Sequence, residues 1–77
     1  MNAGELHSVA SLFDDRAARL DASADVLAAR FATATWSGPA ADRFRVLMVQ
    51  RRNDMRASAD ALREAAHALR LAVGGVA

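Results

Sequence analysis

Trp36-Ser37-Gly38-Pro39 lies at the middle of the 77-residue chain and decides its fold. Gly38 accepts backbone conformations that other residues avoid, and Pro39 fits the first turn of a helix, where a missing N–H has no cost. The long segments on either side both carry apolar residues at helical spacing. Trp36-Ser37-Gly38 is therefore predicted to form a bend between two antiparallel helices, and Pro39 is predicted to begin the second of them.

The segment before the bend predicts a helix over about 3–34. Asn2 can cap its start, and Glu5 stands three positions later as the partner of a capping box. An apolar seam then recurs at alternating spacings of four and three, which is the pattern of a heptad helix. Its members are Leu6, Ala10, Phe13, Ala17, Leu20, Ala24, Leu27, Phe31 and Ala34.

The segment after the bend predicts a second helix over about 39–73. Gly38 or Ser37 can cap it, Asp42 complements the positive helix end, and Gly74-Gly75 is expected to stop it. Its expected seam consists of Phe44, Met48, Arg51, Met55, Ser58, Leu62, Ala65, Leu69 and Ala72.

Folding the chain at the bend pairs seam residues whose numbers add to about 75, with large residues facing large ones and small residues facing small ones. Examples are Phe31–Phe44 and Ala17–Ser58, and the exception is the layer in which Arg51 faces Ala24. The fold class expected is all-α, a single antiparallel two-helix hairpin over residues 1–77. Its predicted core is Leu6, Phe13, Leu20, Leu27, Phe31, Met48, Met55, Leu62 and Leu69.

Apolar residues outside the seam predict a second contact surface. A chain of 77 residues is near the lower limit for a self-sufficient core, and it has no cysteine to add a disulfide. We expect two hairpins to pair into a four-helix bundle, either as a homodimer or with a second helical-hairpin protein. The predicted interface residues are Val9, Leu12, Val26, Phe44, Val46, Leu47 and Val49.

The charge distribution argues against nucleic acid as a partner. Ten arginines and no lysine are balanced by seven aspartates and two glutamates, for a net charge of +1, whereas nucleic-acid binders show a basic excess. Five arginines of the second helix are expected to form a solvated, ion-paired face, and Asp15–Arg19 and Arg56–Asp60 can pair one turn apart. The five are Arg45, Arg52, Arg56, Arg63 and Arg70.

Several other features predict binding and not catalysis. No nucleophile–base set, carboxylate pair or glycine-rich phosphate loop can be assembled, so no enzyme activity and no cofactor are expected. His7 and His67 lie at the open end of the hairpin without an evident third ligand, so no metal is expected. No apolar run is long enough for membrane insertion. Arg51, on the seam, either extends along Ala24 to water or pairs with an acid of a partner.

The mid-chain Trp36-Ser37-Gly38, followed by Pro39 and by Phe44 early in the second helix, resembles the WXG-type small proteins of type VII (ESX) secretion. The resemblance covers nearly the whole chain. It implies a dimer of hairpins, export without a cleaved signal peptide, possible contact with the secretion ATPase, and Trp36 and Gly38 as a bend and recognition motif. The family's Tyr-x-x-x-Asp/Glu tail motif has no counterpart, because the chain has no tyrosine.

The resemblance implies a secretion substrate, export adaptor or chaperone-like partner, cytoplasmic before export and then secreted or bound to the cell surface. Three explanations of the missing tail motif stay open: the partner supplies it, it has been lost or trimmed, or this chain is a helper that is not exported. A non-secreted dimerisation module that stabilises another helical protein is the alternative function. A membrane-surface helix or a small DNA binder is a third, poorly supported class. Trp36 itself either only packs over the bend or also takes part in recognition.

Overall fold

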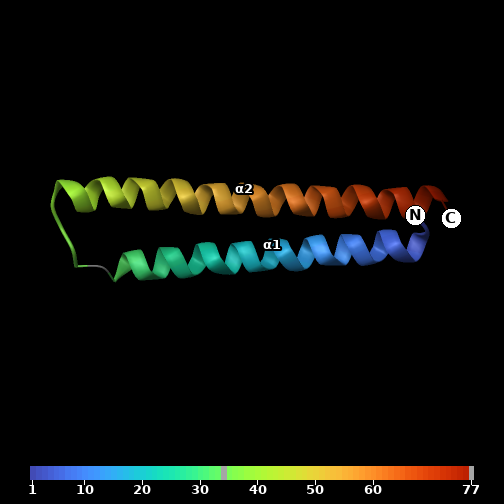
Figure 1. Ribbon diagram of the computed structural model, residues 1–77, viewed down its shortest axis with the longest axis horizontal. Helices are drawn as coiled ribbons and strands as arrows, with labels where there is room; N and C mark the ends of the chain where they lie inside the picture. Colours follow the sequence, from blue (N-terminus) through green and yellow to red (C-terminus); the bar gives the residue numbers. More distant parts are fainter. Residues whose placement is uncertain (34, 77) are drawn as a thin grey trace.

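The computed structural model describes residues 1–33 and 35–76, which form two long helices joined by a bend. Helix α1 spans Ala3–Ala32 and helix α2 spans Pro39–Val76. The helices run antiparallel along their whole length, and both chain termini lie at the same end (Figure 1). The hairpin measures 59 × 15 × 14 Å, so its cross-section is that of a single pair of helices.

The start of α1 is fixed by the capping box that the sequence predicted. The Asn2 side chain accepts a hydrogen bond from the backbone N–H of Glu5 at 2.9 Å, and the backbone N–H of Asn2 donates to the Glu5 carboxylate at 3.4 Å. These bonds satisfy backbone donors that have no partner within the helix. At the other end, the Thr33 hydroxyl donates to the carbonyl of Arg30 at 3.1 Å. The predicted last residue of this helix, Ala34, lies outside the described residues.

Gly38 sets the start of α2. Its φ is +108°, a conformation that costs little only for glycine, and its carbonyl accepts the first helical hydrogen bond, from Asp42 N–H, at 3.0 Å. The predicted stop at Gly74-Gly75 is wrong, because α2 continues through both glycines to Val76. Glycine weakens a helix but does not end one unless the chain needs a left-handed residue there.

The fully buried side chains between the helices are all alanines. They are Ala10, Ala17 and Ala24 of α1 and Ala41, Ala59 and Ala66 of α2. No larger side chain among the described residues is fully buried. Small residues at the centre of the interface let the two helices approach closely.

The buried alanines of α2 correct half of its predicted seam. Ser58 and Arg51 are exposed, and the buried or half-buried residues are their neighbours Ala59 and Arg52. The other half is the row of Met48, Met55, Leu62 and Leu69, and all four of these residues are half-buried. Helix α2 is therefore rotated about its own axis relative to the predicted layers, so that Ala59 faces α1 in place of Ser58.

Candidate partner-binding surface

The bend is held by an aromatic cluster and one arginine. The ring centroids of Phe31 and Phe44 lie 5.5 Å apart, which is the predicted Phe31–Phe44 contact, and Trp36 lies 5.5 Å from Phe44. The Arg45 guanidinium donates to the Trp36 carbonyl and pairs with Asp42 at 3.3 Å. The backbone around Trp36 is thereby fixed, while 52% of the residue's surface stays exposed. Trp36 thus packs and is also available to a partner.

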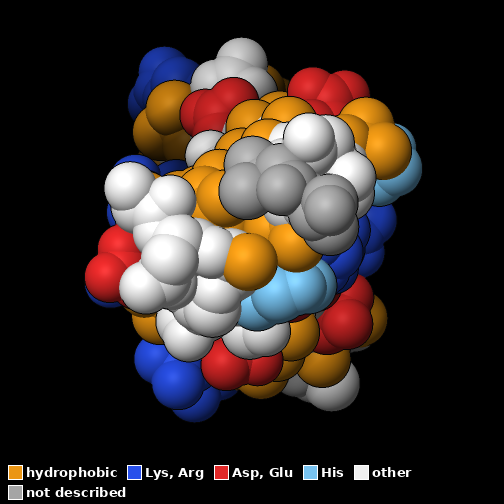
Figure 2. Space-filling view, turned by 90° about the vertical axis from the view of Figure 1, so that its right-hand side faces the viewer, with side chains coloured by type: hydrophobic (Ala, Val, Ile, Leu, Met, Phe, Trp, Pro, Cys, Tyr) orange, Lys and Arg blue, Asp and Glu red, His pale blue; other side chains and the backbone are white. Residues whose placement is uncertain are grey.

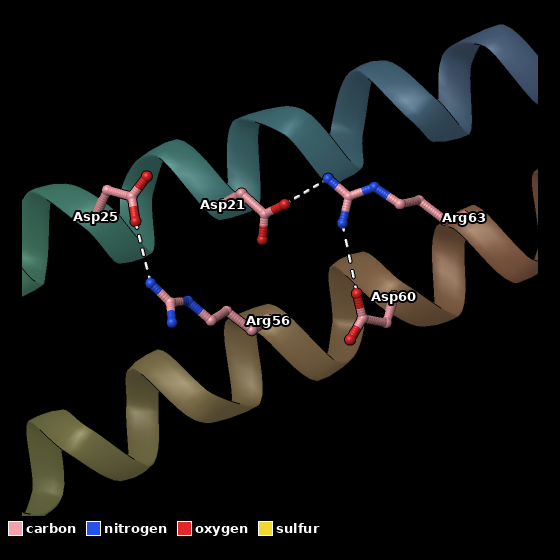
Figure 3. Close-up of polar contacts among 5 residues, drawn as sticks. All are labelled: Asp21, Asp25, Arg56, Asp60 and Arg63. Atoms are coloured by element: carbon pink, nitrogen blue, oxygen red, sulfur yellow. Dashed lines mark hydrogen bonds and ion pairs between the residues drawn. The ribbon is translucent and has the colours of Figure 1, made fainter.

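One edge of the hairpin, here called the closed edge, is lined by aspartates of α1 and arginines of α2 that pair across the helices. Arg56 pairs with Asp25 at 3.1 Å, Arg70 pairs with Asp14 at 2.5 Å, and Arg63 pairs with Asp21. Figure 3 shows two of these pairs bridging the helices, with Arg63 also reaching Asp60 of its own helix.

The closed edge corrects the predicted local pairs. Arg56 was expected to pair with Asp60 one turn away, but it pairs with Asp25 of the other helix, and Asp60 pairs with Arg63. The expected Asp15–Arg19 pair is not among the ion pairs of the described residues. The hydrogen bond to Asp21 is the main cause that raises the pKa of the Arg63 guanidinium.

The opposite edge, here called the open edge, contains three adjoining hollows. The first, near the bend, has a volume of about 210 Å³, the second about 640 Å³ and the third about 420 Å³. Leu27 and Met48 line both the first and the second, and Ser23 lines both the second and the third. Together they form a shallow groove from the bend to the middle of the hairpin. Its apolar side chains are Leu20, Val26, Leu27, Phe31, Trp36, Phe44, Met48, Met55 and Leu62, with Ala22 beside them.

Arginines without an ion-pair partner lie along this groove. None of these arginines pairs with a carboxylate within residues 1–33 and 35–76. They are Arg16, Arg19, Arg30 and Arg51, and they line the three hollows.

Arg52 lies on the closed side and lacks a partner for a different reason. Its Nε is buried and has no hydrogen-bond partner among the described groups. The predicted ion-paired face of α2 is therefore present for Arg45, Arg56, Arg63 and Arg70 but not for Arg52.

The structure divides the predicted interface residues among the open edge, the closed edge and the outer face of α2. Val26 and Phe44 line the open edge directly. Val9 and Leu12 stand seven residues before Arg16 and Arg19, so on a heptad helix they extend the same rows toward the termini. Val9 is half-buried, Leu12 is 47% exposed and Val26 is 50% exposed.

The other three predicted residues lie around α2 beyond Phe44. Val49 stands seven residues before Arg56 and shares a small hollow with Arg52, which places it on the closed side. Val46 and Leu47 line a separate hollow of about 440 Å³ on the outer face of α2. All three are between 48% and 59% exposed. The seven predicted residues therefore do not form one continuous surface.

The predicted core residues lie between the helices but are only partly covered. All nine are half-buried, and six of them line the open edge. The sequence reasoning missed Leu71, which is 64% exposed on the outer side of α2. It also missed the closed edge, although Asp14 and Asp21 recur at the same seven-residue spacing as the arginines opposite them.

Apolar side chains also reach the surface at the end of the hairpin. Over the end that carries both termini, apolar side chains show near the middle of the surface, and charged side chains lie mainly toward its rim (Figure 2). Across the described part of the chain no three metal-ligating side chains gather, and neither helix is apolar enough over a sufficient length to cross a bilayer.

Comparison with known proteins adds no relative: no family model, no curated protein and no solved structure matches this chain. The structure shows the two-helix hairpin that the sequence predicts.

Proposed function

We propose that this chain is a binding protein that pairs through its open edge with a second helical hairpin, and that it acts as a substrate partner or export adaptor of a type VII-like secretion system. The observation that carries the pairing is the exposure of its large apolar side chains. Nothing larger than alanine is fully covered within the described residues. A second hairpin on the open edge would complete a four-helix core around those side chains.

The accessible surface gives the scale of the missing contact. The chain exposes 5418 Å², whereas a compact monomer of 8.2 kDa is expected to expose about 4,500 Å². The difference of roughly 900 Å² is close to the about 800 Å² that each partner buries in an interface of standard size. Covering the open edge would therefore bring the chain to the surface area of an ordinary globular protein.

The secretion part of the proposal depends on the Trp36-Ser37-Gly38 bend. Gly38 holds the only positive φ among the described residues, and the aromatic cluster fixes the chain on both sides of it. A fixed, half-exposed indole at the tip of a rod is suited to recognition by another protein, because tryptophan is enriched at binding hot spots. In this proposal the partner hairpin supplies the missing tyrosine motif, which is one of the three explanations that the sequence leaves open.

Light scattering with size exclusion, together with circular dichroism, tests the pairing. A complex of two hairpins has about twice the chain mass of 8.2 kDa. Val26→Asp should weaken it, because it places a charge in the largest hollow of the open edge. The control is Leu71→Asp, which makes the same change to aspartate at another apolar residue that is exposed on the outer face. Equal weakening by both variants would show that the open edge is not the interface.

Secretion is tested by Trp36→Ala in a bacterial host with an active type VII system. We expect the variant to keep the mass of the paired complex and to lose export into the medium. Unchanged export would remove Trp36 from recognition and leave it as a packing residue of the bend.

A second candidate function is a dimerisation module that stabilises another helical protein and is not exported. The half-covered core favours this candidate, because pairing with another helical protein would by itself cover the exposed apolar side chains along the groove, and no export is needed to explain them. Normal pairing without export of the wild-type chain would select this candidate.

A further inference from the structure

The unpaired positive charge of the molecule is concentrated on the open edge. Arg16, Arg19, Arg30 and Arg51 line its hollows and have no carboxylate partner among the described residues. All four are exposed. None of the nine acidic residues of the chain lines any of these hollows.

The acidic residues lie outside the three hollows of the open edge. Asp14, Asp21 and Asp25 neutralise the arginines of the closed edge, and Asp42 and Asp60 pair with arginines of their own helix. The rest of the chain carries six arginines against nine acidic residues, so the net charge of +1 hides an opposition between the basic open edge and the acidic remainder.

This arrangement discriminates between possible partners of the proposed pairing. A second copy of the chain would bring four more arginines to the same groove, and like charges across an interface are unfavourable. A hairpin with carboxylates beside its apolar stripe would pair with the same arginines as they leave water. Guanidinium groups suit this role, because they form two parallel hydrogen bonds to one carboxylate.

We infer that the partner of the open edge is a different chain, an amphipathic helical hairpin whose apolar stripe is flanked by aspartate and glutamate. This inference rests on the proposed pairing. It sets the class of the partner: the chain is one half of a heterodimer, and charge selects the other half. The apolar side chains of the groove argue for a protein partner and against nucleic acid, which would expose them to phosphates.

A charge-reversed copy of the chain supplies a defined acidic partner. The variant Arg16→Glu/Arg51→Glu keeps every apolar side chain of the open edge and changes the net charge by four units. A matched control, Arg43→Glu/Gln50→Glu/Ala57→Glu, makes the same change in net charge on one outer row of α2, at positions that are all exposed. Circular dichroism of each variant verifies that the hairpin is intact.

The measurement is the anisotropy of wild-type chain labelled at its N-terminus, titrated with wild type, the reversed copy, the control copy or a DNA duplex. We expect the reversed copy to bind about tenfold more tightly than wild type or the control, equivalent to about 1.4 kcal/mol. The advantage should fall between about 0.1 M and 1 M salt, because the Debye length shrinks from about 10 Å to about 3 Å.

Each other outcome overturns the inference in a distinguishable way. If wild type binds itself as tightly as it binds the reversed copy, the partner is a second copy, and the pairing stands without the charge selection. If no protein copy binds at all, the proposed pairing fails with the inference. If only the DNA duplex binds, the arginines serve phosphates and the open edge is a nucleic-acid surface.

Discussion

Ala59→Leu tests the packing of the hairpin at its closest approach. Ala59 is fully buried between the helices, so three additional carbon atoms have no space unless the helices move apart. Overpacking of this kind costs about 1–3 kcal/mol. For a domain of this size, each kcal/mol lowers the melting temperature by about 4–8 °C. We therefore expect the variant to melt roughly 10 °C below wild type.

The matched control for this prediction is the neighbouring residue. Ser58→Leu adds a similar side chain at an exposed position, where substitutions usually change the stability by less than about 0.5 kcal/mol. Thermal unfolding of both variants is followed by circular dichroism at one protein concentration, because pairing adds to the apparent stability. A larger loss for Ser58→Leu than for Ala59→Leu would refute the observed packing and restore the layers that the sequence predicted.

Three further predictions concern local features of the fold, each checked by thermal unfolding. Gly38→Ala should destabilise the chain by about 1–2 kcal/mol through its positive φ alone, whereas Gly74→Ala inside α2 should stabilise it by about 0.5–1 kcal/mol; equal effects would contradict the assigned backbone. Asp21→Asn should cost no more than about 1 kcal/mol, and the loss should shrink in high salt, because the pair it breaks is exposed to solvent. Asn2→Ala should cost about 1 kcal/mol by removing the cap of α1, and an unchanged melting temperature would mean that this helix end is frayed in solution.

The features that the sequence predicted well are local or repeat at a fixed spacing. The Asn2–Glu5 capping box needs only residues three apart, and the bend needs only the Gly38-Pro39 pair. The Leu and Met row of α2 is half-buried, and no neighbouring row offers large apolar residues at the same spacing. These features do not depend on how one helix is turned against the other.

The features that it missed depend on that rotation. Ser58 and Ala59 are adjacent and both small, so either one completes a heptad seam, and only the packed structure selects the alanine. The sequence also cannot decide between Arg51 and Arg52 as the seam residue, and the structure half-buries Arg52 and exposes Arg51. The pairing of Arg56 with Asp25 joins residues that are far apart in sequence, so a search for pairs within one helix returns Asp60 instead.

The division of the predicted partner surface has the same origin. A hydrophobic stripe read from the sequence collects Phe44 and Val49 together, because both follow the bend within a few residues. Val49 lies on the closed side, next to Arg52, and Phe44 lines the open edge. The rotation of the second helix about its axis therefore decides which apolar residues a partner can cover.

The hairpin also implies an order in which the chain assembles. The aromatic contact between Phe31 and Phe44 closes a short loop around the bend, whereas the cross-helix ion pairs join residues 31, 42 and 56 positions apart. Loop closure costs more entropy as the loop grows, so the structure is expected to form like a zipper from the bend toward the termini. Unfolding is then expected to begin at the end of the hairpin opposite the bend, and the tip that carries Trp36 is expected to unfold last.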